Sequence, residues 1–437
     1  NSSIVVRWYT DEAVDSAVTY GTDPEALTSQ VSSAAPTTAH ELTLTGLQPD
    51  TTYYYALLTG PGPEDTGTTL RVMASGEDFH FRSAPVTGTG HADGPTRFLI
   101  TGDPGTGDLS SVSMRDGWRR WLAASAGPSP DGWLILGDNA YESGTTEEFQ
   151  DHLFAVFQEE LRTSALWPVM GNHDGFTSVS STQRGPFFDL FTMPSQAESG
   201  GVASNTEAYY AFDHGNVHVV VLDSYDTPRD ADEPMAVWLD ADLAQASGNA
   251  GIRWIMVAFH HPPYSKGSHD SDARLHQIEM RENIVPILDR YGVDLVFSGH
   301  SHSYERTPPI AGHYGFSSTF DETTMVKLPG FGDPDRDGAY TKPTARQADS
   351  GVVYIVTGNA GQTSEGDFDH PAMLEVNPNP LGAVVVDATD TRLEVSLVDE
   401  AGATVDHFAI DKGPSPSPTP TLSRTPTPSV TAAASAS

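Results

Sequence analysis

The chain has 437 residues, enough for two or more domains with a large hydrophobic core. Its formal net charge of −36 argues against general binding to nucleic acid or to an anionic membrane surface, because both are polyanions. Cysteine is absent, which excludes disulfides and thiolate metal sites, and no apolar run is long enough to span a bilayer.

Residues 1–85 show the alternating pattern of short strands separated by turn residues. The strands are expected at residues 3–9, 17–20, 41–44, 52–58 and 79–82. The segment LQPDTTY at 47–53 resembles the tyrosine corner of a fibronectin type III sandwich, and Trp8 fits a core position of an early strand. We therefore expect an all-β, fibronectin III-like sandwich with a structural role. The chain starts at Asn1 inside a strand-like pattern without a signal peptide, so we interpret this end as processed or truncated, with the first strand missing upstream.

Residues 86–95 form a linker rich in Pro, Gly and Thr, and from Thr96 the pattern changes. Continuous apolar runs, typical of strands buried on both faces, alternate with amphipathic helices until Gly351, after which strands follow one another. The helices are expected at residues 113–124, 146–162 and 273–291. This order predicts that residues 96–411 form an α/β domain, a two-sheet β-sandwich flanked by helices.

The last segment, residues 412–437, consists mainly of Pro, Ser, Thr and Ala. Such a composition is typical of an extended, disordered linker or stalk. Together with the absence of cysteine, it suggests a secreted or cell-wall-associated protein. We expect the tail to attach the protein to a cell wall or to a further module.

Two histidines follow the apolar run at 293–297, at positions 300 and 302. In extended backbone, residues two apart share a face, so both imidazoles can point to the same side. Four other apolar runs also end in residues that commonly bind metals, namely Asp103, Asp138 with Tyr141, Asn172 with His173 and Asp174, and His260 with His261. Because ligands of α/β sheets bind beyond the carboxyl ends of the strands, we predict that these side chains share one site.

Seven of these residues make up a predicted set of metal ligands: Asp103, Asp138, Tyr141, Asn172, His260, His300 and His302. If one carboxylate bridges, the set supplies enough bonds for two ions with four protein ligands each. Two adjacent ions can clamp the attacking and the leaving oxygen of a phosphoryl displacement. Oxygen and nitrogen donors without sulfur suit iron, zinc or manganese.

The segments GDPG, GDNAY, GNHD, VAFH and GHSH occur in this order and resemble the five motif blocks of the calcineurin-like metallophosphoesterases. The resemblance covers residues 96–411. Within the superfamily, these segments are most similar to those of the purple acid phosphatases. Broader members of the superfamily place a histidine two residues after the first aspartate, where this chain has Gly105. Purple acid phosphatases have a tyrosine three residues after the second aspartate, as Tyr141 is here, and often a fibronectin-like N-terminal domain.

The resemblance implies a metal-dependent phosphoric ester hydrolase of the acid phosphatase type that acts on small phosphate monoesters. A ferric ion would be bound by Asp103, Tyr141 and His302, with Asp138 bridging, and a divalent zinc, manganese or ferrous ion by Asn172, His260 and His300. The positive charge of the metals would offset the acidic background of the chain. A metal-bound hydroxide would attack phosphorus while a nearby histidine stabilises the leaving alkoxide. We expect His173 in this role, with Asp174 orienting it.

Other residues near the motifs have more than one interpretation. His269 either reaches the substrate or is an ordinary loop histidine. His261 is expected beside the site rather than on a metal, since His260 occupies the motif position. Arg306 is expected to pack against its own loop rather than to bind phosphate. The remaining histidines outside the motifs are expected to be structural or at the surface: His152, His214, His218, His276, His313, His370 and His407.

Two other functions are compatible with parts of the sequence. A phosphodiesterase or nucleotidase would use the same metals, because the ligand motifs determine the chemistry and not the leaving group. A non-catalytic cell-wall or carbohydrate-binding protein could display an inactive enzyme fold on the tail. The complete set of seven ligand residues argues against this last alternative, since an inactive fold has no chemical need for them.

Overall fold

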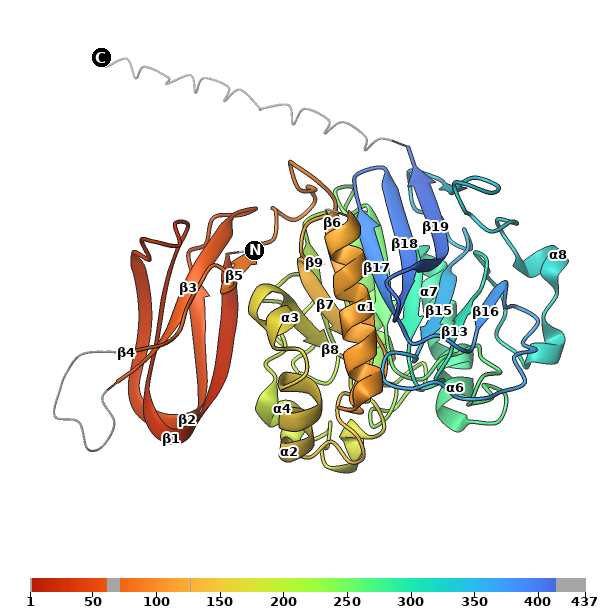
Figure 1. The fold of residues 1–437 in the computed structure, drawn as a ribbon. Coiled ribbons are helices and arrows are strands. Elements are labelled where there is room, and N and C mark those ends of the chain that lie inside the picture. The colour runs from red at the N-terminus through yellow and green to blue at the C-terminus, as the bar shows by residue number, and fades with distance from the viewer. Residues whose placement is uncertain (1, 61–70, 126, 414–437) are drawn as a thin grey trace, which may run out of the picture.

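A computed structural model of the chain describes residues 2–60, 71–125 and 127–413, and consists of an N-terminal β unit beside a larger α/β unit (Figure 1). The predicted fold class is confirmed for these residues. The expected tail, residues 412–437, lies outside the described residues except for Lys412 and Gly413. No helix of the described chain is both long and apolar enough to cross a bilayer.

Residues 2–60 and 71–85 form five strands, whose alternating apolar side chains enclose a core of their own around Trp8 and Tyr53. The strands are β1 (Ser3–Gly21), β2 (Ser29–Thr45), β3 (Thr52–Thr59), β4 (Arg71–Ala74) and β5 (His80–Arg82). Hydrogen bonds join all five in one sheet of order β2-β1-β3-β4, with β5 also on β3. The two strands expected at 3–9 and 17–20 are halves of β1, which stays continuous across register shifts between Tyr9 and Ser16.

The predicted tyrosine corner is confirmed. The backbone N–H of Gln48 donates a hydrogen bond to the Tyr53 hydroxyl over 2.9 Å, and the Tyr53 ring stacks on Phe81 at 5.7 Å between centroids. This bond lets a buried tyrosine satisfy its hydroxyl within the arch that leads into β3.

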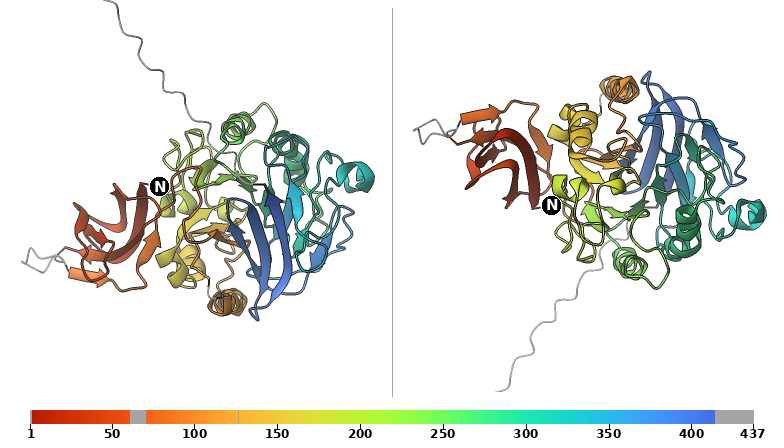
Figure 2. Two further views of the ribbon diagram at one scale, coloured as in Figure 1. Left: turned by 90° about the horizontal axis from the view of Figure 1, so that it is seen from above. Right: turned by 90° about the horizontal axis from the view of Figure 1, so that it is seen from below.

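Direct contacts fix the N-terminal unit on the α/β unit near helices α3 (Gln158–Thr163) and α4 (Pro186–Leu190). The Tyr55 hydroxyl donates to the Arg162 carbonyl over 3.0 Å, and the Arg7 guanidinium donates to the Asp189 carbonyl over 2.6 Å. Figure 2 shows the two units from above and below, with the N-terminal sheet (red) beside the yellow segment and far from the cyan segment that contains α8. The N-terminal unit therefore lies against the outside of the α/β unit.

The α/β unit contains two seven-stranded sheets whose apolar faces share one core. The first sheet has the order β14-β19-β18-β17-β6-β7-β8. Its strands are β6 (Thr96–Thr101), β7 (Gly132–Ile135), β8 (Ala165–Pro168), β14 (Tyr340–Lys342), β17 (Gly382–Ala388), β18 (Arg392–Asp399) and β19 (Thr404–Lys412). The second sheet has the order β16-β13-β15-β12-β11-β10-β9. Its strands are β9 (Tyr210–His214), β10 (Val217–Val221), β11 (Trp254–Ala258), β12 (Leu295–Ser298), β13 (Tyr304–Arg306), β15 (Val353–Thr357) and β16 (Glu375–Asn377).

Helices cover the outer faces of the sheets, and α1 (Leu109–Ser125) lies across β17 and β18 (Figure 1). The other helical segments are α2 (Thr146–Glu148), η1 (Phe149–Phe154), η2 (Asp174–Phe176), α5 (Pro234–Gly248), α6 (Leu275–Glu279), η3 (Met280–Ile284), α7 (Val285–Tyr291), η4 (Ser317–Thr319) and α8 (Glu322–Met325). The helices expected at 146–162 and 273–291 are each interrupted by a π-helical segment, η1 and η3. In the second of them, Pro286 lacks the N–H that would continue the α-helical hydrogen bonds.

The boundary expected after residue 411 is one residue too early, because β19 runs to Lys412. The Lys412 ammonium is buried 2.7 Å from the Asp294 carboxylate, which also pairs with Lys342 and Arg346. The composition of the tail could not show that Lys412 belongs to the domain, because its partner Asp294 is more than a hundred positions away in the sequence.

Candidate metal centre

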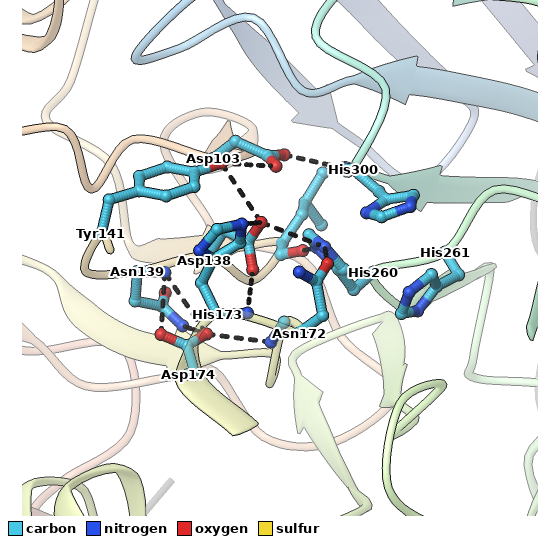
Figure 3. Close-up of polar contacts among 12 residues, drawn as sticks. Asp103, Asp138, Asn139, Tyr141, Asn172, His173, Asp174, His260, His261 and His300 are labelled. Carbon is cyan, nitrogen blue, oxygen red and sulfur yellow. Dashed lines mark hydrogen bonds and ion pairs between the residues drawn. The ribbon is translucent and has the colours of Figure 1, made fainter. Parts of the chain in front are cut away.

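All seven predicted ligands follow strands that end at the same edge of the two sheets. In the first sheet β6, β7 and β8 are parallel neighbours, and in the second sheet β11 and β12 are parallel. Figure 3 shows most of the side chains that follow these strands converging on one point. The convergence results from topology, because the carboxyl ends of neighbouring parallel strands meet.

Tyr141 is at the centre of the first group of donors. Its hydroxyl oxygen lies 3.2 Å from each of three atoms: Asp103 Oδ1, Asp138 Oδ2 and His302 Nε2. His302 Nδ1 faces the Ser364 hydroxyl at 3.2 Å, so Nε2 is the ring nitrogen directed at the site. Two carboxylates, a phenol and an imidazole therefore surround one position.

His260 is at the centre of the second group. Its Nε2 lies 3.1 Å from Asn172 Oδ1 and 3.4 Å from Asp138 Oδ2, and its ring is 5.0 Å from that of His300. Its Nδ1–H donates to the Leu136 carbonyl over 2.8 Å, so Nε2 is the ring nitrogen directed at the site. Asp138 Oδ2 thus lies between the two groups, where a bridging ligand would be needed.

Three of these residues have a left-handed backbone that non-glycine residues rarely adopt. The φ angles are 58° at Asp103, 51° at Asp138 and 65° at His300. Hydrogen bonds hold one oxygen of each carboxylate: His300 N–H donates to Asp103 Oδ2 over 2.8 Å, and His173 N–H donates to Asp138 Oδ1 over 2.9 Å. Strain of this kind persists where a site requires it, and here it directs the remaining oxygens toward Tyr141.

Gly105 cannot be replaced by a ligand residue in this fold. A Cβ atom there would lie 2.3 Å from the backbone carbon and oxygen of Asn139. The Gly105 carbonyl accepts a hydrogen bond from Tyr141 N–H over 2.9 Å. The close backbone approach that excludes a histidine at 105 therefore also positions Tyr141.

The electrostatics of the donors favour bound cations. Burial, with the charges of Asp103 and Asp138, holds the pKa of Tyr141 well above its usual value. Burial also raises the pKa of Asp103, whereas the His260 charge overcomes burial at Asp138 and lowers its pKa to about 2. Burial and neighbouring imidazoles keep the pKa of His300 well below its usual value, so the ring is neutral. Burial opposes the charge of His260, but Asp138 and Asp103 raise its pKa to about 9, so a metal ion on its Nε2 would displace a proton. The neutral His300 beside carboxylates and a phenol fits a metal ion, and a phenolate here would need a highly charged one.

The His173 ring borders the site and is partly exposed. Its Nδ1–H donates to the Glu142 carbonyl over 2.7 Å, and its Nε2 lies 4.0 Å from Asp138 Oδ2. The ring also contacts Tyr141 edge-on at 4.5 Å. A proton on Nε2 would therefore be available to a molecule bound beside the carboxylates.

The prediction that Asp174 orients His173 is wrong. In the described structure the buried Asp174 carboxylate accepts hydrogen bonds from Asn139 Nδ2 at 2.7 Å and from Gly171 N–H at 2.9 Å. Burial, followed by the charge of Asp138, raises its pKa to about 7. Asp174 holds together the two loops that carry Asp138 and Asn172, and the Glu142 carbonyl orients His173 instead.

His269, His261 and Arg306, whose roles the sequence left open, lie at different distances from the site. His269 stacks on His300, with 3.9 Å between centroids and 19° between planes, so it is at the site. The His261 ring lies 4.4 Å from His300, and its Nδ1 faces the Ser224 hydroxyl at 3.0 Å. Arg306 is fully buried and pairs with Asp406 of β19 rather than with its own loop, so it does not face the site.

Several supporting residues had no sequence signal. His152 Nδ1–H donates to the Tyr141 carbonyl over 2.8 Å, although His152 matches no motif. Gln362 Nε2 lies 3.4 Å from His302 Nε2, and His276 stacks on His261 at 4.7 Å. These contacts join distant segments without periodicity, so spacing along the chain cannot indicate them.

Two family models match the chain in the regions that form its two units. A model described as calcineurin-like phosphoesterase matches residues 96–304, and one described as the N-terminal domain of purple acid phosphatase matches residues 1–82. Purple acid phosphatase 22 of Arabidopsis thaliana is 29% identical over 309 residues, which are 68% of this chain and 62% of that protein. An uncharacterized protein of Mycobacterium tuberculosis is 27% identical over 391 residues, 83% of this chain and 67% of that protein. The chain thus spans less than two thirds of the length of the plant relative.

The fold is also similar to a solved structure. The purple acid phosphatase PPD1 from yellow lupin seeds superposes with a TM-score of 0.70 at 16% sequence identity. The match covers 94% of this chain and 72% of the lupin chain. It therefore includes both the N-terminal unit and the α/β unit.

Proposed function

Since the chain belongs to the purple acid phosphatases within the calcineurin-like phosphoesterases, we propose that it hydrolyses small phosphate monoesters with a dinuclear metal centre. The observation that carries the proposal is the position of Asp138 Oδ2, within 3.2 Å of the Tyr141 hydroxyl and 3.4 Å of His260 Nε2. A single carboxylate oxygen between two donor groups suits a pair of adjacent ions. Bound there, such a pair would polarise the phosphoryl group and lower the pKa of a water molecule.

The two donor groups differ in the ions that they suit. Asp103 and Tyr141 offer hard, anionic oxygens, and with His302 they would hold a ferric ion. Asn172, His260 and His300 offer neutral donors and would hold a divalent ion, either zinc, manganese or ferrous iron. Asp138 would be shared by both.

His173 is the group proposed to protonate the leaving oxygen. The bond from Nδ1–H to the Glu142 carbonyl keeps Nε2 directed at the site, and the ring is open to a bound ester. In the imidazolium form Nε2 carries the proton that the departing alkoxide requires. His269, stacked on His300, is proposed to contact the substrate from the other side.

An exposed aromatic ring lies where the leaving group would depart. Phe176 is 57% exposed, and its ring centroid is 5.1 Å from that of His173. An ester whose leaving oxygen meets His173 would bring its organic group near this apolar surface. We therefore include aryl monoesters among the substrates.

The test is turnover on a panel of aryl and alkyl monoesters and diesters, with elemental analysis of the same preparation. The proposal expects hydrolysis of monoesters by protein that holds two metal ions in this site. Faster hydrolysis of diesters would instead assign a phosphodiesterase with the same centre. A metal-loaded protein that hydrolyses none of the esters would favour a non-catalytic role.

An extracellular location is part of the proposal. Its support is the Pro-, Ser- and Thr-rich composition of residues 412–437, which suits a stalk that joins a cell wall or another module. Fractionation of the producing cells, with an antibody against residues 96–411, would test the location. Recovery only from the cytosol would contradict it.

A further inference from the structure

A second cluster of metal-ligand side chains lies away from the candidate centre. It consists of His91 in the connector, Asp131 just before β7 and His214 at the end of β9. His91 Nε2 lies 3.3 Å from Asp131 Oδ1 and 3.3 Å from His214 Nε2. All three side chains are buried, and that of His91 is fully inaccessible.

The separations fit a tetrahedral metal ion. Zinc binds histidine nitrogen and carboxylate oxygen at about 2.0–2.1 Å, so two of its ligand atoms lie roughly 3.3–3.4 Å apart. Two pairs in the cluster already have this spacing, and the three ligand atoms all lie within 4.8 Å of one another. Only the distance between the ligand atoms of Asp131 and His214 would have to become shorter.

Hydrogen bonds to neighbouring groups hold two of the three ligand side chains. His91 Nδ1 lies 2.5 Å from Asp50 Oδ1, the carboxylate–histidine pairing that orients many metal-bound imidazoles. Asp131 Oδ2 accepts the Arg97 N–H over 2.9 Å, which leaves Oδ1 for a ligand. Burial lowers the pKa of His214 to about 4, so its imidazole is neutral.

The cluster joins three separate parts of the fold. Asp50 belongs to the N-terminal unit, Asp131 precedes a strand of the first sheet, and His214 ends the edge strand of the second sheet. We propose that His91, Asp131 and His214 bind a zinc-type divalent ion that fixes the N-terminal unit and connector to both sheets. The site is structural, because its ligands are buried and belong to none of the residues of the candidate catalytic centre.

Metal content and a crystal structure at the zinc absorption edge would test the site. The full-length protein is prepared with zinc, and bound metal per chain is measured for the wild type, His91→Gln and His214→Gln. Each variant is expected to hold one ion fewer than the wild type, to melt several degrees lower, and to keep its hydrolytic activity. An anomalous peak is expected between His91, Asp131 and His214 in wild-type crystals.

His218→Gln is the matched control, since His218 is a buried histidine of the adjacent strand that bonds Asp213 and Asp242 through opposite ring nitrogens. It should retain the full metal content. Should a variant fail to fold, the anomalous map of the wild type decides. The site would be overturned if wild-type crystals showed no anomalous peak at His91 and the wild type held no more metal than His214→Gln. That result would show that a protonated His91, between Asp50 and Asp131, fixes the N-terminal unit to the sheets without a metal ion. A wild type without phosphatase activity would contradict the proposed function and not this inference, because the test measures metal content and the anomalous map.

Discussion

The carbonyl oxygen of Gly105 accepts a hydrogen bond from the backbone N–H of Tyr141 over 2.9 Å. A side chain at 105 would collide with Asn139, so the position where a histidine ligand could stand is closed by the loop that presents the tyrosine. The backbone conformation of these two loops therefore excludes a histidine ligand at position 105 and positions Tyr141 as the ligand instead.

Replacing Tyr141 with phenylalanine should remove a visible absorption band. A phenolate bound to Fe(III) donates charge to the metal under visible light, whereas zinc has a filled d shell and gives no such band. The wild type produced with iron should therefore be coloured, and Tyr141→Phe should lose the band. The measurement is an absorption spectrum with elemental analysis of both proteins. A colourless wild type active with two zinc or manganese ions would contradict the ferric assignment.

Replacing His173 with alanine should reduce the rate while both metals remain. The imidazole borders the carboxylates without completing either donor group, so its loss should lower kcat by about 10²–10⁴. An ester with a very good leaving group should be less affected, since it needs less help from an acid. His80→Ala, in the N-terminal unit, is the control. Loss of metal from His173→Ala would make this histidine a ligand.

Replacing Asp174 with alanine should lower both stability and metal content, in contrast to His173→Ala. The change leaves buried donors of Asn139 and Gly171 without their acceptor, at a cost of about 3 kcal/mol. The loops that carry Asp138 and Asn172 would then separate. Thermal unfolding and elemental analysis measure both effects, with the exposed Asp189→Ala as control. Normal metal content with a slow rate would show that Asp174 acts through His173 after all.

Replacing His218 should reduce the loss of stability at alkaline pH. Burial alone would lower its pKa, but Asp213 and Asp242 raise it from 6.5 to about 9. The stabilisation is therefore fully present below pH 6.5 and is lost as the pH rises through 9, a change of roughly 3 kcal/mol. The melting temperature of the wild type should fall over this range more than that of His218→Gln. Parallel curves for the two proteins would exclude His218 as the source.

Truncation after Gly413 should leave the melting temperature and turnover unchanged, because residues 414–437 contain too few apolar groups to offset the entropy of ordering. Truncation after Asp411 should lower the melting temperature by several degrees. It removes the Lys412 ammonium that pairs with the buried Asp294 and lies 4.4 Å from the Trp254 ring centre. Equal melting temperatures for the two truncated chains would show that Lys412 is dispensable.

The sequence by itself predicted the fold class and brought the seven candidate ligands into one set. Both follow from local regularities: apolar runs of strand length, and polar residues such as Asp103 and His300 directly after them. Parallel strands end at a common edge, so residues that follow different strands must meet there whatever the intervening loops do.

Only the tertiary structure decided how those residues are supported. The bond from His173 to the Glu142 carbonyl, the bond from His152 to Tyr141 and the pairing of Lys412 with Asp294 join segments that no pattern along the chain relates. The same holds for Asp174, whose place beside His173 in the sequence suggested the wrong partner. Neighbouring residues of a tight turn point in different directions, so their partners depend on the packing of distant loops and not on their spacing.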